Sequence, residues 1–105
     1  MVDEERVQFL RQSIDANPGD TFARYALALE FARAGRVDEA VDHFHYLIDH
    51  HPDYSATYYQ AGMLLADQGR TEEARQVLKQ GLEVTRRLGQ AHAASELQGA
   101  LEALD

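Results

Sequence analysis

The sequence repeats itself with a period of 34 residues, and this period restricts the fold more than any other feature. The segment Gly35–Ala40 recurs as Gly69–Ala74, and Pro18 recurs as Pro52. Apolar positions keep the same spacing in two series: Leu10, Phe44 and Leu78, and Ile14, Ile48 and Leu82. A period of about 20–50 residues is typical of solenoids, in which each unit buries its apolar face against its neighbours. The period therefore predicts a repeat protein.

Six helices are predicted between these landmarks. They cover about Glu4–Ala16, Thr21–Ala34 and Val37–His50, then a fourth segment ending at Gln68, a fifth ending near Leu88 and a sixth over about Gln90–Leu104. Apolar residues recur there at helical spacing, and no segment alternates as a strand does. We therefore predict an all-α fold.

The predicted helix ends have recognisable signals. Gly35, Gly69 and Gly89 are expected to end helices, because glycine readily adopts the positive φ found after a helix. Asp20 is expected to cap the second helix, Asp53 or Ser55 the fourth, and Thr71 the fifth, since short polar side chains accept from the free N–H groups of a first turn.

The repeated positions resemble the tetratricopeptide repeat, a helix–turn–helix unit with the pattern W-x2-L-G-x2-Y…A-x3-F…P. The first unit here has Arg24, Leu27, Ala28, Phe31, Ala40, Phe44 and Pro52 at these positions. The second has Tyr58, Ala61, Gly62, Leu65, Ala74, Leu78 and Arg86. Leu10 and Pro18 match the second half of a preceding unit. Among the departures from the pattern, Arg24 replaces a large aromatic residue, Ala61 a leucine and Arg86 a proline.

The resemblance implies an antiparallel helix-pair solenoid of about two and a half repeats, forming a single domain over residues 1–105. A half repeat would cover residues 4–20, complete repeats 21–54 and 55–88, and a capping helix 89–105. Ala28, Gly62, Ala40 and Ala74 would lie where the two helices of a unit cross. We expect larger side chains there to force the helices apart.

The same resemblance implies a protein–protein interaction or adaptor module. In this family the first helix of each unit lines a concave groove, and the corresponding positions are Phe22, Tyr25, Leu29 and Arg33, followed by Tyr59, Gln60, Met63 and Asp67. Spacings of three and four residues put each set on one helical face. The aromatic side chains and the methionine suit an apolar peptide or a helix of a partner protein. An alternative is that part of this stripe is core, covered by the last helix.

Composition restricts the partners further. The net charge of −8 disfavours nucleic acid and anionic membrane surfaces, and it favours a neutral or basic protein ligand. The chain has no cysteine, so thiol chemistry is excluded. Its N-terminus lacks a secretory signal pattern, and no segment approaches the roughly 20 apolar residues of a membrane span. We expect a cytoplasmic protein.

Two other classes of function are open at this stage. The short array could be completed by a second copy, giving a homodimer built on one repeated patch. The histidines at positions 43, 45, 50 and 51 present a remote metal-binding or pH-sensing alternative, with His45 and Asp49 spaced to share an ion. No phosphate loop, nucleophile elbow or zinc-protease motif occurs, so we expect neither an enzyme nor a cofactor or metal.

Overall fold

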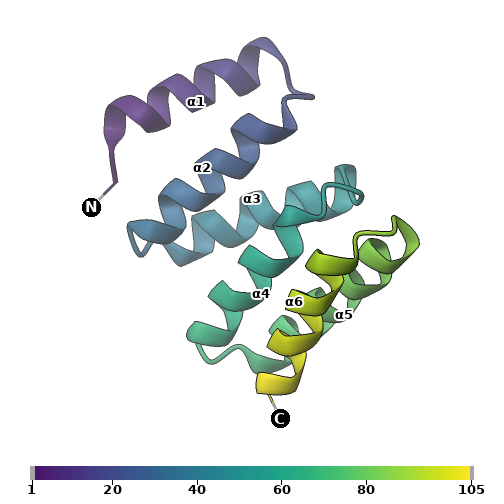
Figure 1. Cartoon of the computed structure of the whole chain (residues 1–105). Coiled ribbons are helices and arrows are strands. Elements are labelled where there is room, and N and C mark those ends of the chain that lie inside the picture. The colour runs from purple at the N-terminus through teal and green to yellow at the C-terminus, as the bar shows by residue number, and fades with distance from the viewer. Residues whose placement is uncertain (1, 105) are drawn as a thin grey trace. The chain divides into compact units, whose positions relative to one another are not determined.

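The computed structural model describes residues 2–104, which form six α-helices joined by short loops (Figure 1). The helices are α1 (Glu4–Ala16), α2 (Thr21–Arg33), α3 (Val37–His50), α4 (Ala56–Asp67), α5 (Thr71–Arg87) and α6 (Ala91–Ala103). No strand occurs among these residues, so the all-α prediction is confirmed. The predicted helix ends agree with the structure to within one residue.

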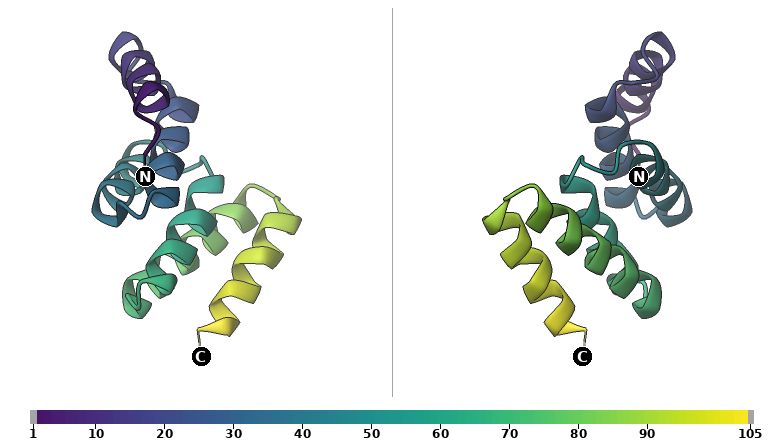
Figure 2. Two further views of the ribbon diagram at one scale, coloured as in Figure 1. Left: turned by 90° about the vertical axis from the view of Figure 1, so that its left-hand side faces the viewer. Right: turned by 90° about the vertical axis from the view of Figure 1, so that its right-hand side faces the viewer.

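The chain divides into two compact units, Met1–His51 and Pro52–Asp105. In the first unit, α2 packs against both α1 and α3. In the second, α5 packs against both α4 and α6, and α6 also touches α4. Figure 2 shows the three helices of each unit from two further sides. The expected domain limits at residues 1 and 105 lie outside the described residues, and a single domain stays a prediction.

The helix ends follow local chemistry, with one expectation corrected. Asp20 caps α2, because its carboxylate accepts a hydrogen bond of 3.0 Å from the backbone N–H of Ala23. The three predicted glycines, Gly35, Gly69 and Gly89, have φ of 78°, 74° and 72°, as expected for residues that end helices. The expected cap at Thr71 is wrong: Arg70 stands at the N-cap, and Thr71 is already the first helical residue.

The fourth helix begins differently from either expectation. Ser55 stands at its N-cap, but the serine side chain makes no capping hydrogen bond. Asp53 is instead engaged by Arg87, whose guanidinium donates to the carboxylate. This bond ties the loop before α4 to the end of α5.

Small residues lie where the paired helices cross, as predicted. Ala28, Ala40 and Ala74 have no exposed surface. A Cβ placed on Gly62 would lie 2.4 Å from Cδ2 of Leu78 on the partner helix, closer than carbon atoms approach. The helices of each pair therefore pack closely. No helix formed by residues 2–104 combines the length and hydropathy needed to cross a membrane.

Candidate functional site

In the first unit, the four residues expected to bind a partner lie along α2. Phe22 is the most open of them, with 68% of its surface exposed. Tyr25 and Leu29 are half-buried, and Arg33 is exposed. The ring of Tyr25 lies 6.4 Å from the ring of Phe44 on α3, measured between centroids. The α2 face therefore presents an open phenylalanine beside two partly covered apolar side chains.

An ion-pair cluster borders this face. The carboxylate of Glu30 is buried and lies 2.7 Å from Arg33 and 3.2 Å from Arg6 of α1. The hydrogen bond from Arg33 lowers the pKa of Glu30, and this effect outweighs the opposing effect of burial. Because Arg33 is paired within the chain, it adds little free positive charge to the α2 face.

In the second unit, the corresponding residues lie along α4. Tyr59 and Met63 are half-buried, whereas Gln60 and Asp67 are exposed. None of the eight residues on the two faces is fully buried. Each face therefore retains surface that a ligand can contact.

A cluster on α2 and α3 was not anticipated from the sequence. Nη1 of Arg24 lies 3.4 Å from Nδ1 of His43, and the Arg24 guanidinium carbon lies 3.7 Å from the centre of the Tyr46 ring. His43 stacks on Phe31, with ring centres 5.8 Å apart, and Tyr46 stacks on His50 at 3.9 Å. The sequence feature that could have indicated this cluster is Arg24, which stands where the repeat pattern has an aromatic residue.

The histidines in this cluster serve packing rather than an evident metal site. Burial lowers the pKa of His43, and the positive charges of Arg24 and Arg11 lower it further. Among residues 2–104, no group of three or more His, Asp or Glu side chains is placed to hold an ion. His45 and Asp49, the spaced pair noted in the sequence, are both exposed on α3.

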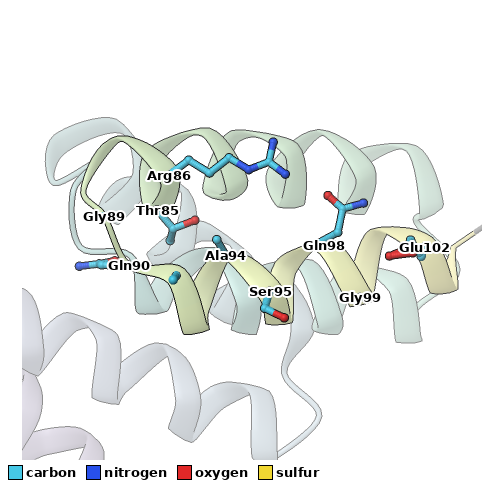
Figure 3. Close-up of a pocket in the computed structure, with 10 residues that line it drawn as sticks. Thr85, Arg86, Gly89, Gln90, Ala94, Ser95, Gln98, Gly99 and Glu102 are labelled. Atoms are coloured by element: carbon cyan, nitrogen blue, oxygen red, sulfur yellow. The ribbon is translucent and has the colours of Figure 1, made fainter.

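A pocket of about 630 Å³ lies between the end of α5 and α6 (Figure 3). Its walls are mostly small or polar side chains, among them Thr85, Arg86, Ala94, Ser95, Gln98 and Gly99. The repeat pattern predicts a capping helix for this segment and does not predict a pocket. The sequence feature that could have indicated this pocket is the group of small residues in α6 that lie outside the face formed by Leu97 and Leu101.

The tetratricopeptide repeat family model matches residues 31–104. The chain belongs to the tetratricopeptide repeat family. The expected helix-pair repeat fold is thereby confirmed, as is the resemblance seen in the repeated positions.

Solved structures of tetratricopeptide repeat proteins agree with this assignment. A tetratricopeptide repeat domain protein from Salinibacter ruber, solved by NMR, is 38% identical with a TM-score of 0.80, and the match covers 85% of this chain and 90% of that one. The crystal structure of a tetratricopeptide repeat domain protein from the same organism gives 39% identity, a TM-score of 0.75 and coverage of 81% and 96%. A protein from Bordetella parapertussis is 26% identical with a TM-score of 0.79, over 93% of this chain and 85% of that one. No curated protein matches the sequence.

Tetratricopeptide repeats generally form protein–protein interaction modules. A fold alone does not assign a function, which depends instead on the surfaces that the individual side chains form.

Proposed function

We propose that this tetratricopeptide repeat protein is an adaptor that binds short segments or helices of a partner protein, with the face of α2 in the first unit and the face of α4 in the second each serving as a contact surface. The observation that carries the proposal is Phe22, which is 68% exposed at the start of the stripe that continues through Tyr25 and Leu29. A large apolar side chain held open beside other apolar groups is characteristic of an interaction surface.

The chemistry of the two faces indicates the kind of ligand. Tyr25 and Tyr59 offer apolar rings with a polar tip, and the flexible thioether of Met63 adapts to irregular apolar surfaces. Asp67 is exposed, Arg33 is paired with Glu30, and the chain carries a net charge of −8. Electrostatic steering therefore favours an apolar segment with neutral or basic flanks.

The test compares the wild-type protein with a Phe22→Ala/Met63→Ala variant in affinity capture from native lysate. Hot-spot truncations cost about 2 kcal/mol or more each, so the variant should retain the partner at least about tenfold less well. Gln76→Ala/Lys79→Ala is the matched control, because both residues are exposed on α5 and lie outside the proposed faces. The control should retain the partner as the wild type does.

Two outcomes would contradict the proposal. In one, no protein is retained specifically by the wild type. In the other, the variant and the control retain the same proteins equally well. A symmetric homodimer through the same two faces is the competing proposal, and it predicts that Phe22→Ala/Met63→Ala converts a dimer to a monomer in solution.

A further inference from the structure

We infer that copies of this chain associate head to tail, with α1 of one copy packing into the pocket between α5 and α6 of the next. This inference does not depend on the proposed function, which uses the faces of α2 and α4. It also differs from a symmetric dimer, because the two contacting surfaces are different parts of the chain.

The helices of this repeat alternate between the first and the second member of a pair. Helices α2 and α3 form one complete pair, and α4 and α5 form the other. Among the described residues, α1 precedes them as a second helix with no first helix beside it, and α6 follows them as a first helix with no second helix beside it. Since a repeat unit cannot bury its apolar face alone, the repeat-facing surfaces of α1 and α6 are uncovered within the described residues. Each of these two helices is of the kind that the other packs against in a complete unit.

Helix α1 has an exposed face with a large apolar side chain, as a helix that lacks its packing partner should. Phe9 is 66% exposed and, with Gln8 and Gln12, borders a shallow surface on the outside of α1. His43 stands 34 residues after Phe9, and Tyr46 stands 34 residues after Gln12.

In the complete pair these later residues both contact the first helix. His43 stacks on Phe31, and Tyr46 lies under the guanidinium of Arg24. One further period on, Val77 replaces Phe9 and is only 6% exposed. Phe9 and Gln12 therefore occupy positions that face a first helix when one is present.

The pocket on the second unit offers such a first helix. Leu97 and Leu101 are the buried residues of α6, and the adjoining face carries Ala94, Ser95 and Gly99, which border the pocket (Figure 3). A Cβ built on Gly99 would meet no atom within 4 Å, so this wall is open. A pocket of about 630 Å³ accommodates a phenylalanine side chain. The small residues on one surface thus complement the exposed aromatic residue on the other.

The charged residues at the ends of α1 and α6 make the direction in which α1 docks on α6 measurable. The helices of a pair run antiparallel, as shown by the contacts of Tyr58 and Gly62 with Gly81 and Leu78, respectively. Antiparallel docking brings the C-terminal end of α1, with Asp15, toward Arg86 at the α5–α6 turn. It brings Glu4 and Glu5 toward Glu102 near the end of α6. One end of the contact is therefore attractive, and the other is repulsive.

The contact is heterologous, so each copy has one free α1 face and one free pocket. Two variants block these surfaces separately: Phe9→Glu on α1 and Ser95→Arg in the pocket. Sedimentation equilibrium of the wild type should show an average mass above the 11.8 kDa monomer that rises with concentration. Each variant alone should stay monomeric. An equimolar mixture should form a one-to-one heterodimer, because one intact pocket then meets one intact α1.

Phe22→Glu is the matched control, since it makes the same change at a phenylalanine of nearly equal exposure on α2. It should associate like the wild type and should lose only the partner sought under the proposed function. Far-UV circular dichroism checks the helicity of every variant. If Phe9→Glu lowers helicity, Gln12→Arg obstructs the same face at another exposed position.

A monomeric wild type at about millimolar concentration, where even weak specific contacts are populated, would overturn the inference. So would a Ser95→Arg variant that still associates, or a mixture of the blocked variants that stays monomeric.

The orientation has its own test. Glu102→Lys should strengthen the association about two- to fivefold, and Asp15→Lys should weaken it by a similar factor, as expected for exposed charge pairs. Parallel docking would instead bring Asp15 toward Glu102, so Asp15→Lys would then strengthen the association, and that result would overturn the completion of a repeat unit.

Discussion

Gly81 of α5 lies directly against Tyr58 of α4. A Cβ built on Gly81 would lie 2.4 Å from Cβ and 2.7 Å from Cγ of Tyr58. Tyr58 has no exposed surface, and its hydroxyl donates a hydrogen bond to the carbonyl of Pro52. Because Cβ is fixed to the backbone, Tyr58 cannot yield by rotating about a distant bond. The absence of a side chain at Gly81 therefore sets the distance between α4 and α5.

We predict that Gly81→Ala lowers the free energy of unfolding by about 1–3 kcal/mol, the usual cost of overpacking. Urea denaturation followed by circular dichroism measures the change. Gly99→Ala on α6 is the control, because its Cβ meets open space. That control should be neutral or stabilising by up to about 1 kcal/mol, since alanine favours a helix over glycine. Equal destabilisation by the two substitutions would refute this account of the α4–α5 contact.

The second prediction concerns Ala74, which has no exposed surface on α5. Ala74→Leu adds three carbon atoms to a close-packed crossing and should destabilise the second unit by about 3 kcal/mol or more, the upper range of overpacking costs. Gln76→Leu adds an apolar side chain at an exposed position of the same helix and should change stability by less than about 0.5 kcal/mol. An unchanged melting temperature for Ala74→Leu would contradict the packing scheme.

The positions with a strong local or periodic signal were predictable from the sequence. Gly35 and Gly69 end helices because of their own backbone freedom, and Gly62 recurs at the crossing position of the repeat pattern. Asp20 caps α2 with its own side chain. These features depend on neighbouring residues or on the period.

The features that could not be predicted depend on contacts between distant side chains. Asp53 looked like a helix cap, but it is bound by Arg87, which the sequence places 34 residues away. Arg24 was noted only as a departure from the pattern, although it joins His43 to Tyr46. Phe9 is exposed because no first helix packs against α1 within the described residues. Local propensity carries no information about such pairings.

The third prediction uses the buried carboxylate of Glu30. Its pKa is lowered by the hydrogen bond from Arg33, so the folded state holds the proton less tightly than the unfolded state, where the ordinary value is 4.5. The resulting stabilisation is present above pH 4.5 and is lost as the pH falls through the folded-state pKa. Glu30→Gln should therefore flatten the loss of stability below pH 4.5 in urea titrations. Glu83→Gln, at an exposed position of α5, is the control and should lose stability below pH 4.5 as the wild type does.

The fourth prediction concerns His43, a base whose lowered pKa also makes the folded state less stable as the pH falls. Burial, followed by Arg24 and Arg11, lowers its pKa from the ordinary value of 6.5, while Asp42 and Glu39 act in the opposite direction. As the pH falls below 6.5, the unfolded state takes up the proton first. The stabilisation is therefore complete above pH 6.5 and is lost as the pH falls through the folded-state pKa.

Geometry supports this direction, because the unprotonated Nδ1 of His43 accepts from Arg24 at 3.4 Å. A proton on Nδ1 would replace that hydrogen bond by repulsion between two cations, loosening the contact between α2 and α3. We expect the urea concentration at the unfolding midpoint of the wild type to decrease as the pH is lowered from 7.5 to 5. His43→Gln should show a smaller fall over that range, whereas His45→Gln, at an exposed position of the same helix, should reproduce the wild-type fall. If His43→Gln and the wild type lose stability equally, His43 is not the group that makes the α2–α3 contact sensitive to pH.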